Sequence, residues 1–221
     1  MGNMIELTAS DGHKFQTYAT GDEKSLRGLV VVQEIFGVNR HMRAVSDRLA
    51  SFGYRVLCPA VFDRAERGVE LGYDQAGAQK GLALRARIDE ADVMRDIEAT
   101  VAKLSPRPTG IIGYCWGGTI AWWGATRSKS FKAAIGWYGG GIAATKEAQT
   151  HCPVQLHFGV KDKSIPLQDV EAIRKSHPDL PVYVYENAEH GFGCEDRPSF
   201  NAEANQLAEQ RSLAFFAEHL V

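Results

Sequence analysis

The feature that most constrains the fold is a cysteine between closely spaced glycines. Residues 109–118 read TGIIGYCWGG, so Cys115 stands between Gly113 and Gly117, after an apolar stretch and before a helix-like segment. Glycines at these positions let backbones approach where a β-carbon would clash. The pattern predicts a sharp strand-to-helix turn that presents the Cys115 thiol at a helix N-terminus, which favours an anion. Because a thiol ionises more readily than a hydroxyl and forms thioesters, we expect a nucleophile here.

Strand and helix patterns alternate on both sides of this turn. Residues 27–33, RGLVVVQ, form the continuous apolar run of a strand buried on both faces. Asp11-Gly12 predicts a hairpin turn, and Asn39 predicts a helix cap. The predicted strands cover 4–9, 13–19, 27–33, 54–58, 110–112, 131–138, 154–158 and 182–186. The predicted helices cover 39–52, 74–87, 90–104, 116–127, 166–177 (capped by Ser164) and 202–220. We therefore expect an α/β fold, with a mostly parallel central sheet and helices on both faces, as one domain over 1–221.

Composition narrows the classes of function. The formal net charge of −2 gives no basic surface for nucleic acid, and no apolar stretch is long enough to span a membrane. The first residues, MGNMIELTASDG, lack the features of a secretory signal. We expect a cytoplasmic protein, monomeric or a weak homo-oligomer, without nucleic-acid or membrane partners. The four cysteines lack zinc-site spacing, so no metal site is expected.

A nucleophilic cysteine needs a base, and the base needs an orienting partner. In α/β-hydrolases the chain order is nucleophile, acid, histidine. His190 stands in the loop that leaves the last predicted strand, at the end where open α/β sheets gather their sites. Asp162 follows the preceding predicted strand, whereas Asp169 falls inside the next helix. We predict that Cys115, Asp162 and His190 act together, with Asp162 an acid rather than a simple turn residue.

An oxyanion hole in this arrangement uses two backbone N–H groups. One follows the nucleophile and the other comes from the exit loop of an early strand, which indicates Trp116 and Ile35. Glu34 stands in the same exit loop, directly after an apolar run. Its predicted position at the mouth of the site favours a functional carboxylate over a solvated loop residue.

With these residues assembled, the chain resembles the dienelactone hydrolase family, the carboxymethylenebutenolidases. The resemblance spans nearly the whole length, and together its motifs are far more specific than the cysteine turn alone. They are VVVQEIFGVN at 30–39, CPAVFDR at 58–64, GYCWGG at 113–118, WYGG at 137–140, GVKDKSIP at 159–166 and AEHGF at 188–192.

The resemblance implies a Cys-Asp-His triad at Cys115, Asp162 and His190. It also implies an activating glutamate at Glu34, which hydrogen-bonds the thiol in the resting enzyme until substrate displaces it. A neutral resting thiol is less open to oxidation than a permanent thiolate. The implied reaction is hydrolysis of a carboxylate-bearing enol-lactone to a keto acid such as maleylacetate.

The resemblance further implies that two arginines grip the substrate carboxylate. Arg64 matches the first, in a pocket beneath the predicted loop 60–73. The second is expected four residues after the histidine, where this chain has Cys194, and Arg197 follows three residues later. We take Arg197 as the second candidate, with Phe36 and Tyr138 as further substrate-binding residues. Cys194 is either a second thiol near the site or a packing residue.

The expected activity is therefore hydrolysis of a small-molecule lactone or ester through a cysteine thioester, without metal or organic cofactor. Two alternatives stay open at this point. One is a general carboxylesterase or thioesterase on the same fold. The other is a ligand-binding homologue without catalysis.

Overall fold

A twisted sheet forms the centre of the computed structural model, which describes residues 2–221. Met1, the first residue of the predicted 1–221 unit, lies outside the described residues. The strands are β1 (Asn3–Thr8), β2 (Lys14–Thr20), β3 (Arg27–Val32), β4 (Tyr54–Pro59), β5 (Thr109–Tyr114), β6 (Ala133–Trp137), β7 (Val154–Gly159) and β8 (Val182–Tyr185). Within residues 2–221 these eight strands pair in the order β1-β2-β4-β3-β5-β6-β7-β8. β1 pairs antiparallel with β2, and β2 with β4, while every other pairing is parallel.

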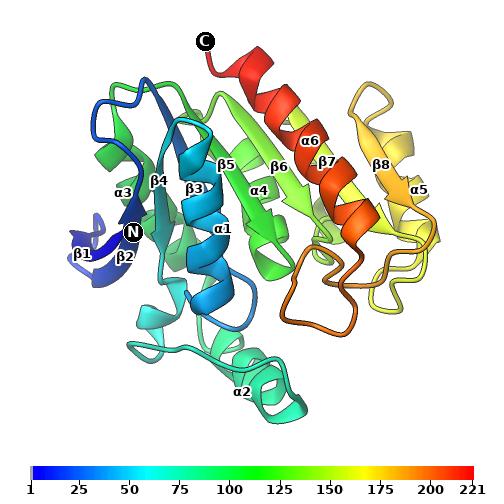
Figure 1. Cartoon of the computed structure of the whole chain (residues 1–221), viewed down its shortest axis with the longest axis horizontal. Helices are drawn as coiled ribbons and strands as arrows, with labels where there is room; N and C mark the ends of the chain where they lie inside the picture. Colours follow the sequence, from blue (N-terminus) through cyan, green and yellow to red (C-terminus); the bar gives the residue numbers. More distant parts are fainter. Residues whose placement is uncertain (1) are drawn as a thin grey trace.

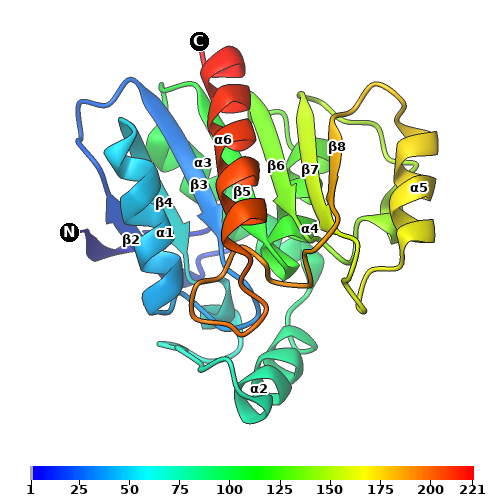
Figure 2. The same ribbon diagram turned by 45° about the vertical axis from the view of Figure 1, so that its right-hand side comes forward.

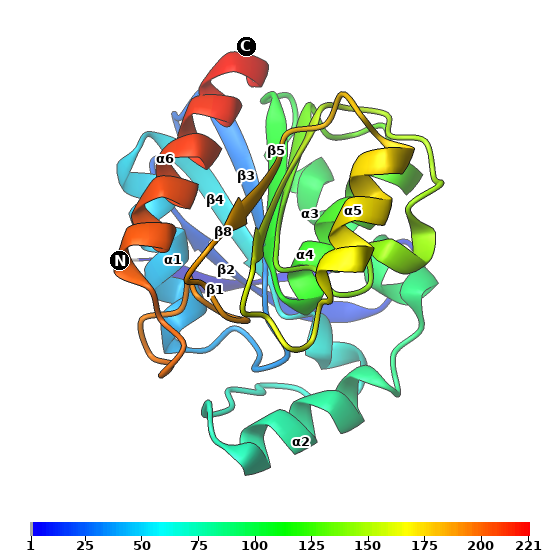
Figure 3. The same cartoon turned by 90° about the vertical axis from the view of Figure 1, so that its right-hand side faces the viewer.

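Helices cover both faces of this sheet. They are α1 (Arg40–Ser51), α2 (Gln75–Arg85), α3 (Glu90–Leu104), α4 (Trp116–Arg127), α5 (Leu167–Ser176) and α6 (Ala202–His219), with short 3-10 turns η1 (Val61–Arg64) and η2 (Ala143–Thr145). Seen along the sheet, α1 and α6 lie on one face and α3, α4 and α5 on the other (Figure 3). Helix α2 lies apart from both layers, below the carboxyl ends of the parallel strands (Figure 1). The expected mostly parallel α/β architecture is confirmed.

Local sequence signals account for most element boundaries. Asn39 caps α1, since its side chain accepts the N–H of Met42 at 3.1 Å, and Asp74 caps α2 in the same way. The expected cap at Ser164 is wrong. Pro166 is the N-cap of α5, and the N–H of Ser164 donates to the Asp162 carboxylate at 2.7 Å. Asp162 accepts the N–H groups of both Ser164 and Ile165, and these two bonds form the turn that precedes the helix.

The burial of the central strand β3 agrees with the prediction made from its apolar sequence. Residues 28–32 of β3 are all buried, as expected of a strand covered on both faces. No helix among residues 2–221 combines the length and the apolar character needed to cross a membrane.

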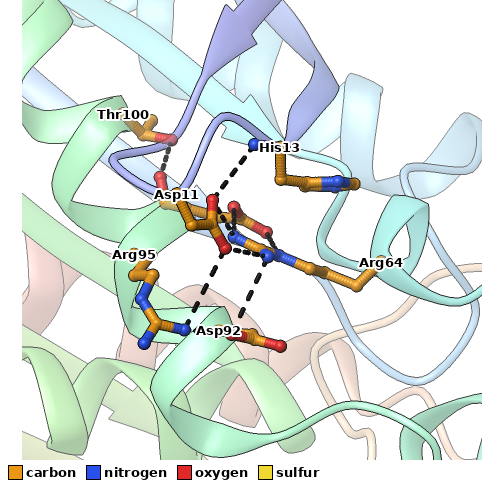
Figure 4. Close-up of polar contacts among 7 residues, drawn as sticks. Asp11, His13, Arg64, Asp92, Arg95 and Thr100 are labelled. Atoms are coloured by element: carbon orange, nitrogen blue, oxygen red, sulfur yellow. Dashed lines mark hydrogen bonds and ion pairs between the residues drawn. The ribbon is translucent and has the colours of Figure 1, made fainter.

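A buried ion cluster around Arg64 ties the first hairpin to the body of the protein (Figure 4). The Arg64 guanidinium donates to both oxygens of Asp96 on α3, at 2.7 and 3.0 Å, and to Asp11 in the β1–β2 turn at 2.6 Å. The Arg64 side chain is only 8% exposed and that of Asp96 is fully buried. Hydrogen bonds from Arg64 lower the pKa of Asp11 to about 2. The fork of Arg64 is therefore occupied by carboxylates of its own chain.

We expect Arg64→Ala to lower the free energy of unfolding by about 3–5 kcal/mol, because it leaves the Asp96 carboxylate buried without its partner. Denaturant titration followed by circular dichroism measures this loss. Lys14→Ala is the matched control: Lys14 is exposed and pairs with exposed Glu6, so its loss costs less than about 1 kcal/mol. Equal effects of the two substitutions would contradict a locking role for Arg64.

Candidate active site

The turn at Cys115 joins β5 to α4 in a strained backbone conformation. Cys115 has φ 55° and ψ −117°, a region that residues with a side chain rarely adopt. A β-carbon at Gly113 would lie 1.8 Å from the carbonyl oxygen of Gly117, and one at Gly117 would lie 2.3 Å from that of Val32. Only glycine fits either position. The predicted close approach is present, and it fixes Cys115 at the carboxyl end of the sheet.

His190 and Asp162 meet Cys115 from two separate loops. The Cys115 Sγ lies 3.2 Å from His190 Nε2, and His190 Nδ1 lies 2.7 Å from Asp162 Oδ2. An ionised carboxylate only accepts hydrogen bonds, so Nδ1 carries a proton and Nε2 faces the thiol. Asp162 is buried and also accepts the backbone N–H groups of Ser164 and Ile165. The structure thus brings the three predicted residues into one chain of hydrogen bonds.

The electrostatic state of His190 follows from these partners. Burial alone would lower its pKa, but the hydrogen bonds to Asp162 and Cys115 outweigh burial and raise the pKa to about 10. His190 is therefore held in its protonated form at neutral pH. The ring of Tyr138 packs edge-on against it, with ring centroids 5.2 Å apart.

Glu34 and Arg197 form a second charged pair beside this chain. The Glu34 side chain is fully buried, and its Oε1 accepts from Arg197 Nη1 at 3.4 Å. Its Oε2 is buried without a hydrogen-bond partner among residues 2–221. The expected hydrogen bond between Glu34 and the Cys115 thiol is absent from the described contacts, because the thiol faces His190 and the carboxylate faces Arg197.

The backbone N–H groups of Ile35 and Trp116 have no acceptor in the part of the chain that the structure describes. Both residues line the same pocket as Cys115 and His190. Two N–H groups without partners next to a nucleophile are what an oxyanion hole requires. The geometry is therefore compatible with the role expected for these two residues.

The pocket at Cys115 has a volume of about 460 Å³. Phe36 and Arg197 line it, as the sequence predicted. Tyr138 does not, because it is fully buried behind His190. The remaining lining residues are Ala78, Leu82 and Arg85 of α2, Thr119, Gly140, Gly141 and Ser164.

Two expectations about this pocket are wrong. Arg64 does not line it, because its guanidinium is held by Asp11 and Asp96. Its cover is α2 rather than the loop 60–73, since Ala78, Leu82 and Arg85 form that wall. Their i, i+4, i+7 spacing in the sequence indicates that they share one face of a helix. It does not indicate which part of the molecule that face contacts.

The positive charge of the pocket comes from Arg85 and Arg197. No acidic residue is among the described residues that line it. The Arg197 guanidinium lies 5.7 and 5.8 Å from the ring centres of Phe36 and Tyr73, which hold it in place. Arg197 was predicted from the sequence to line the pocket, whereas Arg85 was not.

The remaining candidates lie away from the chemistry. Cys194 is fully buried, and burial raises its pKa to about 12, so it is a packing residue. His157, which was not a predicted site residue, is buried in β7, where its ring nitrogens contact Tyr185 and Gln155. Among residues 2–221, no group of histidine, cysteine and acidic side chains is arranged to hold a metal ion.

Known proteins are similar to this chain in sequence and in fold. The model of the "Dienelactone hydrolase family" matches residues 15–220. A Synechocystis protein named "Putative carboxymethylenebutenolidase" is 35% identical over 212 residues, 87% of this chain and 86% of its own length. The "Carboxymethylenebutenolidase" of Pseudomonas putida is 30% identical over 96% of this chain and 95% of its own length. A Klebsiella pneumoniae crystal structure named "Putative Dienelactone Hydrolase" superposes with a TM-score of 0.83 at 28% identity, covering 98% of each chain.

These similarities confirm the expected α/β-hydrolase fold and the resemblance seen in the sequence motifs. The chain belongs to the dienelactone hydrolase family, and it is a hydrolase that acts on esters or lactones.

Proposed function

We propose that this enzyme hydrolyses a small lactone or ester that carries a carboxylate, through a thioester on Cys115. The observation that carries the proposal is a thiol hydrogen-bonded to His190 in a pocket that also contains two arginines. An enol-lactone that opens to a keto acid is the substrate type that this combination suits best. A general carboxylesterase or thioesterase differs from it in having no use for the arginines.

In the first half-reaction the proton shared by Cys115 and His190 rests on His190 Nε2, and the sulfur attacks the substrate carbonyl carbon. The carbonyl oxygen becomes an oxyanion, which accepts the N–H groups of Ile35 and Trp116. The intermediate collapses by breaking the ester C–O bond. The leaving oxygen takes the proton from His190, and in a lactone it stays attached to the acyl group.

In the second half-reaction a water molecule attacks the thioester. His190 takes a proton from the water, with Asp162 orienting the ring and stabilising the imidazolium that forms. The second oxyanion collapses by breaking the C–S bond. The product forms as a carboxylic acid and loses its own proton to solvent, while the proton that His190 took from water restores the starting state of the His190–Cys115 pair.

Arg85 and Arg197 are the residues proposed to bind the substrate carboxylate, in place of Arg64. Guanidinium groups match carboxylates bidentately, and both line the pocket. Arg197 is already paired with Glu34, so an anionic substrate competes with Glu34 for it. We propose that Glu34 holds Arg197 until the substrate arrives and is then free to turn toward the thiol.

Replacing the nucleophile tests the proposal most directly. Cys115→Ala should lower ester and lactone turnover by at least about 10⁴-fold and abolish the acylation burst with a p-nitrophenyl ester. Cys115→Ser should also be much slower, because a serine hydroxyl has no accessible anion at neutral pH. The control is Cys152→Ala, which removes a buried thiol outside the pocket. Undiminished turnover by Cys115→Ala would rule out the thioester route.

Asp162→Asn should lower the pKa of His190 from about 10, since it removes a charged hydrogen-bond partner of the protonated ring. An NMR titration of the His190 imidazole follows the shift, and kcat should fall by about 10³–10⁴-fold. Because the folded-state pKa exceeds the ordinary value of 6.5, protonation of His190 stabilises the folded enzyme fully below about pH 6.5. That contribution disappears as the pH rises through about 10. An unshifted titration in Asp162→Asn would show that Asp162 does not act on His190.

Arg85→Ala and Arg197→Ala should each lower kcat/KM for carboxylate-bearing substrates by about 10- to 100-fold, the worth of a hydrogen bond to a charged group. Turnover of a neutral aryl ester should change far less with Arg85→Ala. Arg87→Ala is the matched control, since Arg87 donates to the Ala65 carbonyl and does not line the pocket. Unchanged kcat/KM for carboxylate-bearing substrates in both variants would favour the general esterase.

A further inference from the structure

Helix α2 is joined to the rest of the molecule at the pocket. It lies apart from the sheet and from the other helices when the molecule is viewed from the front and after a turn of 45° (Figures 1 and 2). Leu82 and Ala83 are exposed, whereas the neighbouring Gly81 is buried. The buried residues of α2 are Gly77, Gly81 and Leu84, so Gly81 is one of the points at which the helix packs against the rest of the molecule.

Gly81 rests directly on the backbone of Ile35. A β-carbon at Gly81 would lie 1.9 Å from the Ile35 carbonyl oxygen, 3.0 Å from its carbonyl carbon and 3.3 Å from its Cβ. Glycine in the interior of a helix costs about 1 kcal/mol relative to alanine. The helix alone does not favour glycine at this position, but the close contact with Ile35 requires it.

This contact acts on a residue proposed to bind the oxyanion. The carbonyl of Ile35 and its N–H flank the same Cα, so a helix packed against the carbonyl limits how the residue can rotate. The Ile35 N–H lacks an acceptor among residues 2–221, so no hydrogen bond within the protein holds it in place. A donor preorganised for an oxyanion needs such support from its surroundings.

The same helix also contacts the other proposed donor residue. The Arg85 guanidinium, one turn after Gly81, lies 5.9 Å from the ring centre of Trp116. Ile35 and Trp116, which both line the pocket, are therefore each approached by a residue of α2.

We propose that α2 positions the oxyanion hole, with Gly81 as the positioning residue that fixes Ile35. This inference rests on the proposed function, since it takes Ile35 and Trp116 as the oxyanion donors. It adds a role to α2 beyond covering the pocket. The element that binds the substrate anion through Arg85 also sets the geometry in which its carbonyl reacts.

The test compares two reagents that both react with Cys115. 1,1,1-Trifluoroacetone gives a hemithioketal: the sulfur bonds to the carbonyl carbon, the thiol proton goes to His190, and the oxygen becomes an oxyanion. Iodoacetamide alkylates the sulfur by displacing iodide and forms no oxyanion. Only the first reaction needs the oxyanion hole. The ratio of the two reactivities therefore distinguishes a displaced oxyanion hole from a general loss of Cys115 reactivity.

Gly81→Ala should weaken trifluoroacetone inhibition and lower kcat for p-nitrophenyl acetate, each by about 10- to 100-fold. The iodoacetamide rate should stay within about twofold. Since alanine improves helix propensity, fraying of α2 would not account for the loss. Gly77→Ala is the matched control: its β-carbon would clash with the carbonyl of exposed Gly72, 2.0 Å away, and not with Ile35. It should leave the inhibition unchanged.

Equal slowing of both reagents by Gly81→Ala, or the same weakening in Gly77→Ala, would overturn the inference. If Gly81→Ala does not fold, backbone hydrogen exchange measured on the unsubstituted enzyme tests whether α2 positions Ile35. The small trifluoroacetone adduct should slow exchange in α2 together with residues 33–37, and slowing confined to 33–37 would overturn it. Failure of this inference leaves turnover dependent on Cys115, whereas failure of the proposed function shows as turnover by Cys115→Ala.

Discussion

The tight packing of the turn at Cys115 against the end of β3 is the constraint on which the rest of the site depends. Gly113 and Gly117 leave no room for a β-carbon, and Cys115 adopts a positive φ that costs about 1–3 kcal/mol. The surrounding sheet holds this strain, in part through the hydrogen bond from the Cys115 N–H to the Trp137 carbonyl. In return the thiol and the N–H of the next residue converge on one point, next to the exit loop of β3.

Aromatic packing places the histidine against that fixed thiol. Phe192, two residues after His190, stacks on Trp137 with ring centres 5.4 Å apart, and Tyr138 packs on His190 itself. The Trp137 indole N–H donates to Ser212 on α6, which joins the last helix to the same cluster. The residues proposed to carry out the reaction are thus supported by the sheet and its core.

The sequence allowed the close approach of Cys115, Asp162 and His190 to be predicted because each is tied to a strand end by chain order. Cys115, Asp162 and His190 follow three strands whose apolar runs were readable, and parallel strands bring their exits together. Arg64 was misplaced because a motif match does not reveal that Asp11 and Asp96, far apart in sequence, occupy its fork. Arg85 was missed because helical periodicity gives a face but not its neighbour. Long-range packing decides both cases.

The separation of α2 from the sheet has a consequence for how such an enzyme diversifies. Substitutions on its inner face, at Ala78 or Leu82, alter the shape of the pocket without entering the core that holds Cys115 and His190. They meet little of the cooperative packing that makes core changes costly. Gly81 is the exception, because its neighbour is backbone. Residues on one helix face can therefore change the selectivity of the pocket, while Gly81, packed on the backbone of Ile35, has no room for a side chain.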